Sequence, residues 1–410
     1  MKTTGSFKRL SGQLHLWLGL ASGIVVFVVS ITGCLFVFEE EIRNITQKEF
    51  RFVEPQNRPR ISLAQATAII TQQFPDQKIE QIRLFSAADR TIIAKLVDKN
   101  AVSKKKPGKE DEEEYEGKKV VVSLNPYTGA VLGPWNMDQD FLHTVEKMHK
   151  TLLLGEVGKW IIKVNIVIFL VMLISGLVLW FPRKKNQVKT AFTLKFDAKW
   201  QRINHDFHNV LGFYFVFPLL LITLTGIWWA IKPSQKLVYA VLGDTRKEMK
   251  KPVSVVQPGR VFSPVQAFET VAPHHPGWNE AHINFAKHSK DAVKVNLRYP
   301  YEIVKKQNVF EFDQYSGKLM KSELFNDYSA ADNVKHANRD LHTGQAFGLF
   351  GKILMFLASL FSATLPWSGF LIWYQKKYKK PVARPRRVPV PASQEVKRKP
   401  VYQPRVPVKA

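Results

Sequence analysis

Four long stretches of the sequence contain no charged side chain, and they constrain the fold more than any other feature. They are residues 10–38, 164–181, 209–231 and 353–374. A helix needs about 20 apolar residues to cross the ~30 Å hydrocarbon core of a membrane. Two long polar segments separate these stretches, and the mean hydropathy is −0.14. The pattern excludes a single soluble domain and also a bundle that lies wholly in the membrane. The only cysteine, Cys34, excludes an intramolecular disulfide and a cysteine-based metal or iron–sulfur site.

Basic side chains are concentrated in three short segments next to the apolar stretches. Residues 1–13, 183–204 and 376–410 hold 22 Lys and Arg against two acidic residues, which is +20 of the net charge of +26. The positive-inside rule places these segments in the cytoplasm and the two polar segments outside. We therefore expect a multi-pass protein of a bacterial inner membrane, with both termini cytoplasmic and both large segments in the periplasm. The charge is explained by topology and the lipid bilayer, so no nucleic-acid partner is expected.

The chain repeats itself at an offset of 193 residues around its membrane spans. His15, His143 and His149 fall on His208, His336 and His342, and the Thr-Gly and Ser-Gly pairs at 32–33 and 175–176 also recur. The offset predicts a tandem duplication in which each half is a span, an external segment and a second span. Such parallel repeats are related by an axis along the membrane normal.

The expected fold class is an integral membrane α-helical protein with four transmembrane helices and two small external α+β domains. A helix should begin after Ser62 and after Ser263, and strand–turn–strand patterns cover residues 120–132 and 309–320. The predicted order is the N-terminus and first span (1–38), external domain (39–140), second span with a lead-in helix (141–182), cytoplasmic loop (183–204), third span (205–232), external domain (233–335), fourth span with a lead-in helix (336–375), and a basic, proline-rich tail (376–410) that is expected to be disordered.

Histidines at the ends of the spans are the candidate cofactor ligands. His15 and His208 lie at the cytoplasmic ends of spans one and three, and His149 and His342 at the external ends of spans two and four. Ionisable groups near hydrocarbon are functional candidates, and a twofold axis brings equivalent residues towards each other. Two facing imidazoles suit a planar b-type haem, so the sequence predicts two haem b groups, one near each membrane surface.

Other residues remain open as ligands or neighbours of such cofactors. His205 shares a helical face with His208, and His143 and His336 form a third matched pair; all three are second-rank ligands. Possible partners of haem propionates are Arg9, Arg202 and Arg339. A zinc site made from His143, His149, His336 and His342 is a chemical alternative, although it does not explain the cytoplasmic pair.

Four histidine-bearing motifs carry a resemblance to a known family. They are Leu14–Gly19 with Thr32-Gly33, Met148–Gly155, His205–Gly212 and Leu341–Gly348. In this order they are similar to the PepSY-associated transmembrane family, and the resemblance covers residues 7–376. It implies four spans with two external PepSY domains. Some members of that family are iron-regulated ferric-siderophore reductases that bind b haem.

The resemblance implies an oxidoreductase that carries electrons from the cytoplasmic side to the periplasm and reduces a ferric siderophore. The donor would be quinol or another donor on the cytoplasmic side, and the haem iron would be held by the histidines named above. Two other classes stay open. One is a non-catalytic PepSY regulator that binds a periplasmic protease or peptide, and the other is a transporter of haem or metal ions.

Overall fold

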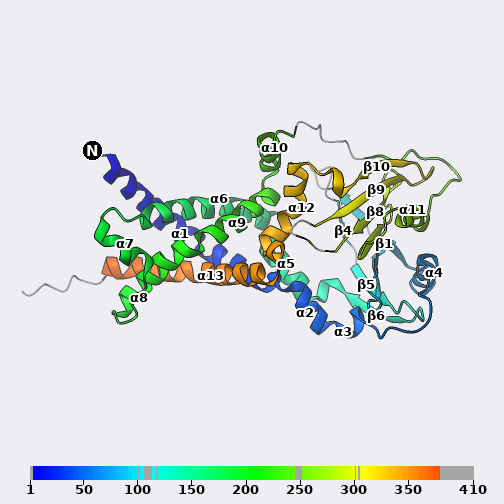
Figure 1. Ribbon diagram of the computed structural model, residues 1–410, viewed down its shortest axis with the longest axis horizontal. Helices are drawn as coiled ribbons and strands as arrows, with labels where there is room; N and C mark the ends of the chain where they lie inside the picture. Colours follow the sequence, from blue (N-terminus) through cyan, green and yellow to red (C-terminus); the bar gives the residue numbers. More distant parts are fainter. Residues whose placement is uncertain are drawn as a thin grey trace, which may run out of the picture.

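The structure, a computed structural model, describes residues 3–99, 102–105, 113–116, 119–244, 252–300, 302 and 305–378. Within these residues the chain forms a bundle of long apolar helices and a β-sheet beyond one end of the bundle (Figure 1). We call this end the sheet end, and the opposite end, which carries residues 183–204, the basic end. The tail predicted to be disordered lies outside the described residues from position 379 onwards.

Four helices are long and apolar enough to cross a membrane, namely Ser6–Val37, Gly155–Trp180, Trp200–Ala230 and Gln345–Tyr378. Each contains one of the four uncharged stretches of the sequence to within one residue. The main elements are α1 (Thr3–Val37), α6 (Gly155–Trp180), α9 (Gly212–Ala230) and α13 (Gly348–Tyr378). The third span begins with α8 (Trp200–Asp206) and a π-helical turn, η2 (Phe207–Leu211). Helix α1 packs against α6 and α13, and α9 packs against the same two helices.

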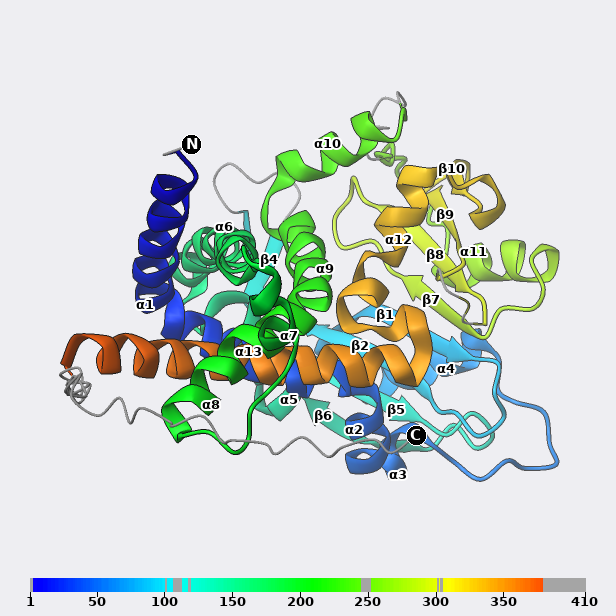
Figure 2. The same cartoon turned by 60° about the vertical axis from the view of Figure 1, so that its left-hand side comes forward.

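Short helices surround both ends of the bundle. Helix α12 lies between the bundle and the strands in both views (Figures 1 and 2). The short helices and 3-10 turns are α2 (Glu39–Thr46), α3 (Lys48–Arg51), α5 (Phe141–Thr151), α7 (Lys185–Phe192), α10 (Lys232–Val241), α12 (Ala330–Thr343), η1 (Met137–Gln139), η3 (Ala272–His274), η4 (Phe325–Asp327) and η5 (Gln345–Phe347).

The two polar segments of the sequence meet in one antiparallel sheet of eight strands. Its order is β10-β9-β8-β7-β1-β2-β5-β6. The strands are β1 (Gln77–Phe85), β2 (Ile92–Asp98), β5 (Lys119–Leu124), β6 (Val131–Asn136), β7 (Glu280–Asn284), β8 (Ala292–Arg298), β9 (Gln307–Asp313) and β10 (Leu319–Glu323). Strands β3 (Val102–Lys105) and β4 (Glu113–Glu116) form a separate pair.

Each segment supplies a helix and a four-stranded meander, and the two meanders join edge to edge. Strand β1 pairs with β7 from Gln81 opposite Asn284 to Phe85 opposite Glu280. The sequence predicted two separate external domains, whereas the structure has a single continuous sheet. The joining strands are about 200 residues apart in the chain, and no local pattern encodes such a pairing.

Two helices cover the face of the sheet that points away from the bundle (Figure 1). They are α4 (Leu63–Gln73) and α11 (Pro264–Val271), and both begin where the sequence predicted. Each start has a capping box, in which the hydroxyl of Ser62 or Ser263 and a glutamine three residues later satisfy the first free N–H groups. Under these helices lies an apolar core that extends across both meanders. The opposite face, towards the bundle, carries polar and charged side chains.

Candidate functional site

At the basic end of the bundle, two histidines from different spans face each other. His15 lies on α1 and His208 on the π-helical turn η2. Their ring centroids are 6.2 Å apart and their planes are at 84°. A π-turn adds one residue to a helical turn and is frequent at functional sites. His208 is the second residue of this turn.

Each ring of this pair is held by a serine hydroxyl from a neighbouring span. Nδ1 of His15 lies 3.0 Å from Ser175 Oγ, and Nδ1 of His208 lies 2.8 Å from Ser368 Oγ. Both hydroxyls donate their own hydrogen to the carbonyl three residues earlier. They therefore accept from Nδ1–H, and Nε2 of each neutral ring keeps its lone pair. A fixed tautomer with a hydrogen-bonded second nitrogen is the usual arrangement of metal-ligating histidine.

A second facing pair lies at the sheet end. His149 on α5 and His342 on α12 have ring centroids 6.3 Å apart, with planes at 80°. Nδ1 of His342 lies 2.9 Å from Thr225 Oγ1, and Nδ1 of His149 lies 3.1 Å from Thr32 Oγ1 and 3.0 Å from the carbonyl of Val29. A carbonyl can only accept, so Nδ1 of His149 carries the proton. Nε2 is again the nitrogen left for a ligand.

Glycines lie against all four rings. A Cβ built at Gly176 would lie 3.2 Å from Cε1 of His15, and one built at Gly369 would lie 3.3 Å from Cε1 of His208. A Cβ at Gly33 would lie 3.4 Å from Cε1 of His149, and one at Gly226 would lie 3.6 Å from Cε1 of His342. At Gly176 and Gly369 a Cβ would press on the imidazole. At Gly33 it would only touch the ring, and at Gly226 it would clash with Ile166 instead.

The contacts of the two pairs are related by the same sequence offset of 193. Ser175 and Gly176 hold His15 as Ser368 and Gly369 hold His208. In the same way, the Thr-Gly pair at 32–33 holds His149 and the pair at 225–226 holds His342. The recurrence covers ligand candidates and their neighbours, whereas a lone core histidine would not be expected to keep so many matched contacts.

The ring separations fit one metal ion between two imidazoles. A metal–nitrogen distance of about 2.0 Å and about 1.1 Å from nitrogen to ring centre give ~6.2 Å between centres of ligands on opposite sides of an ion. Among the described residues there is no group of three or more His, Cys, Asp or Glu side chains that could hold a metal ion. Two axial ligands and a cofactor that supplies the remaining ones therefore fit better than tetrahedral zinc.

The two pairs lie at different levels of the bundle. His15 belongs to the first pair and Thr32 contacts the second, and both are on α1. Seventeen residues of helix at 1.5 Å each give a separation of about 25 Å along the bundle. The pairs therefore lie near opposite ends of the apolar spans.

The second-rank histidines do not join either pair. His205 is half exposed and its Nδ1 faces Asp206 Oδ1 at 3.5 Å. His143 lies 3.7 Å from Glu146. His336 stacks on Tyr328 at 4.3 Å, with Gln307 beside its Nδ1. Burial lowers the pKa of His143, and it lowers the pKa of His336 to about 4.

The three arginines named as propionate partners have different surroundings. Arg9 is exposed. Arg202 lies near His208 but forms an ion pair with the buried carboxylate of Asp206 at 2.8 Å. Arg339, three residues before His342, pairs with Glu39 at 3.2 Å and is largely exposed. Arg339 is thus close in sequence to a facing histidine and open to solvent.

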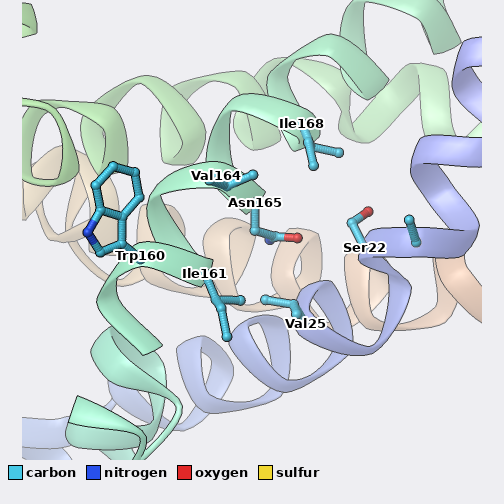
Figure 3. Close-up of a pocket in the computed structure, with 8 residues that line it drawn as sticks. Ser22, Val25, Trp160, Ile161, Val164, Asn165 and Ile168 are labelled. Carbon is cyan, nitrogen blue, oxygen red and sulfur yellow. The ribbon is translucent and has the colours of Figure 1, made fainter. Parts of the chain in front are cut away.

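A groove on the bundle surface lies between the two levels, between α1 and α6 (Figure 3). Its volume is about 330 Å³, and its walls are mostly apolar, including Val25, Ile161 and Val164. Asn165 is more than nine-tenths buried there, and its Oδ1 has no hydrogen-bond partner within the described part of the chain. An amide oxygen without a partner in an apolar groove would accept a hydrogen bond from a lipid-soluble molecule that carries a hydroxyl.

The hydroxyl residues and glycines that hold the rings were not assigned a role from the sequence. Ser175-Gly176 and Thr32-Gly33, with their counterparts, were visible as matched positions of the repeat. Other glycines of the spans lie away from the rings: a Cβ at Gly19 would meet Met172, one at Gly23 would meet Pro366, and one at Gly212 would meet nothing within 4 Å. The residues that contact the rings could have been found from one signal in the sequence, a small polar residue followed by glycine at matched positions of both halves of the repeat.

Comparison with known protein families gives one match. The profile of the family described as PepSY-associated TM region matches residues 13–376. This range contains both facing pairs, the second and third spans, and all but the outer ends of the first and fourth. No curated protein matches the chain.

Proposed function

This chain belongs to the PepSY-associated transmembrane family, and on that premise we propose that it is a b-type haem protein of the bacterial inner membrane that reduces ferric siderophores. In this proposal the basic end lies in the cytoplasm and the sheet lies in the periplasm. Electrons then pass from the cytoplasmic side to the periplasm. The observation that carries the proposal is the presence of two facing imidazole pairs at two levels of one bundle.

The residues that would hold haem are His15 with His208 and His149 with His342. Bound haem supplies reversible one-electron exchange between Fe(III) and Fe(II). The hydroxyls of Ser175, Ser368, Thr32 and Thr225 orient the four rings and keep Nε2 free of a proton. The surrounding apolar spans exclude water from the rings, which favours a stable ligand geometry over exchange with solvent.

Reduction of the substrate releases its iron because siderophore oxygens are hard donors. They hold Fe(III) tightly and Fe(II) far less tightly. Each chelate takes up one electron and its iron leaves as Fe(II), so no group transfer and no covalent intermediate are required. Helix α12 carries His342 of the external pair and, through His336, contacts Gln307 on the sheet, so a chelate bound against this face of the sheet would lie near that pair.

A membrane hydroquinone is the donor that suits the groove between α1 and α6. The free amide oxygen of Asn165 would accept a hydrogen bond from its hydroxyl, and the apolar walls would contact its ring. Oxidation of one hydroquinone to the quinone releases two protons and supplies two electrons, enough for two ferric chelates. The groove lies between the levels of the two pairs along α1.

Spectroscopy of the purified protein tests the proposal. Protein in detergent should show low-spin b-haem spectra that change on reduction with dithionite, and an anaerobic ferric siderophore should reoxidise it. His15→Ala and His342→Ala should each remove a different haem signal, while His205→Ala, at an exposed ring beside the first pair, should remove neither. Protein without a Soret band would refute the proposal and favour the PepSY regulator. If the haem stays reduced after a ferric siderophore is added, the reductase activity is refuted but haem binding is not.

A further inference from the structure

The face of the sheet that points to the bundle has a charge pattern unlike that of an ordinary solvent-exposed face. Alternate residues of β1, β7 and β8 align across the strands, so Arg83 stands opposite His282, and Glu280 stands opposite both Phe85 and Arg298. Helices rest on both sides of this face. On one side, the carbonyl of Phe50 in α3 accepts hydrogen bonds from Thr91 and Ser123. On the other side, His336 of α12 contacts Gln307. We call the area between them the arginine chamber.

Four arginines define the chamber and lie close to one another. The guanidinium groups of Arg83 and Arg90 lie 5.3 and 4.0 Å from the ring centre of Phe85. Arg298 bonds to the same carboxylate, Glu280, as Arg83 does. The backbone carbonyl of Arg51 accepts a hydrogen bond from the residue after Arg90, and only 7% of Arg51 is exposed. Like charges at this density are destabilising unless something compensates them.

Several nitrogens of these arginines are buried and have no hydrogen-bond partner among the described residues. They are Nε of Arg51, Nε and Nη2 of Arg90, and Nε of Arg298. Buried guanidinium donors are normally satisfied, because leaving one unpaired costs free energy. Arg51 is more than nine-tenths buried and forms no ion pair among the described residues. These donors lie beneath the surface without a partner, and an oxygen anion bound beside them would satisfy them.

The acidic residues nearby neutralise the arginines only in part. Burial and the charge of Arg83 lower the pKa of Arg90, and the charges of Glu40 and Asp89 oppose this shift without cancelling it. Glu280 accepts from Arg83, Arg298 and His282 together; burial opposes its ionisation, but these bonds hold its pKa well below the ordinary value. Its charge is therefore already shared. On α12, burial raises the pKa of Asp340. Burial, and after it the charges of Arg90 and Arg83, lower the pKa of Arg51 to about 10, against the opposing charge of Glu40.

We propose that the arginine chamber binds an anionic ferric chelate through free carboxylate groups, with Arg51, Arg90 and Arg298 as the binding residues. Guanidinium presents paired N–H donors that match the two oxygens of a carboxylate. The chamber is bordered by α12, which also carries His342 of the external pair. The identification of the anion as an iron chelate rests on the proposed function, whereas the preference for anionic over uncharged chelates is independent of it.

Equilibrium binding to the oxidised full-length protein in detergent tests this site with ferric citrate as the probe. Arg51→Gln and Arg90→Gln should each weaken binding about tenfold or more, which is the expected loss of a charge-assisted hydrogen bond. Arg260→Gln, at an exposed arginine near the start of α11, is the matched control and should bind as the wild type does. An uncharged ferric trihydroxamate should bind equally to all four proteins.

A stability measurement separates binding from folding. Each glutamine removes a charge from a repulsive cluster, so both variants should melt at or above the wild-type temperature without ligand. Arg51→Lys, which keeps the charge but not the paired donors, should also bind ferric citrate more weakly. Wild-type affinity in Arg51→Gln and Arg90→Gln would overturn the proposal. Equal affinity for inorganic phosphate or iron-free citrate would overturn its assignment to a ferric chelate.

The outcome can be read separately from that of the proposed function. Arginine-dependent binding of ferric citrate by protein that contains no haem would support the chamber and refute the haem function. Haem-containing protein that reduces an uncharged chelate but does not bind ferric citrate would refute the chamber and leave the reductase standing.

Discussion

Replacement of Ser368 by alanine should weaken haem binding at the basic end without unfolding the bundle. Ser368 Oγ accepts the Nδ1 proton of His208 at 2.8 Å and donates to the carbonyl of Leu365 at 3.1 Å. In Ser368→Ala the buried Nδ1–H loses its acceptor, and the ring is free to rotate or to change tautomer. Loss of such a partner typically reduces metal affinity about 10- to 100-fold, or ~1.4 to 2.7 kcal/mol.

The affinity can be measured by titrating haem into protein from haem-depleted cells and following the Soret absorbance of each site. Ser362→Ala is the matched control: Ser362 is also buried on α13, but its Oγ accepts from Ser30 and touches no histidine. We expect Ser362→Ala to bind haem as the wild type does, and Ser175→Ala to lose as much affinity as Ser368→Ala. Equal affinities in Ser368→Ala and wild type would refute the role of the hydroxyl.

Three further predictions concern other residues. Gly369→Ala places a Cβ 3.3 Å from the ring of a facing histidine and should shift the midpoint potential of the haem at the basic end, whereas Gly212→Ala, which meets nothing, should not; equal potentials would contradict the packing argument. Burial lowers the pKa of His336 to about 4. Between pH 6.5 and 4 the unfolded chain therefore binds a proton at this residue that the folded chain does not bind. The free energy of unfolding should fall as the pH drops through this range. His336→Phe should reduce the dependence of the melting temperature on pH and the exposed-site control His274→Phe should not; unchanged dependence in His336→Phe would contradict the assignment. Asn165→Leu should slow haem reduction by a hydroquinone about tenfold or more and leave reduction by dithionite unchanged, and equal hydroquinone rates would remove the groove as the donor site.

The membrane spans and the pairing partners of the histidines were predictable from the sequence. Long uncharged stretches have no other stable form in a bilayer, and the structure contains a helix at each of them. The offset of 193 residues named His15 with His208 and His149 with His342, and the structure brings these rings within 6.3 Å of each other. The choice between His208 and His205 required coordinates, because only they show that the ring of His208 faces His15 and that of His205 faces Asp206.

The residues that hold the rings and the shape of the sheet could not be predicted in the same way. The hydroxyl of Ser175 contacts His15 only because their helices pack together, since the two residues are 160 positions apart in the chain. The pairing of β1 with β7 joins two strands that are about 200 residues apart in the chain. The arginine chamber follows from that pairing, because Arg83 and Glu280 lie on different strands across the joint.

The continuous sheet also limits how the bundle can move. A carrier that works by alternating access rocks one half of its repeat against the other and opens a path on each side in turn. Here the halves are tied together beyond the sheet end by the ladder of β1 and β7, from Gln81 opposite Asn284 to Phe85 opposite Glu280. A gap between the halves at that end would require this ladder to break. A sheet that joins the two halves in this way is compatible with the passage of electrons through a closed bundle. It opposes the passage of an iron chelate or a whole porphyrin.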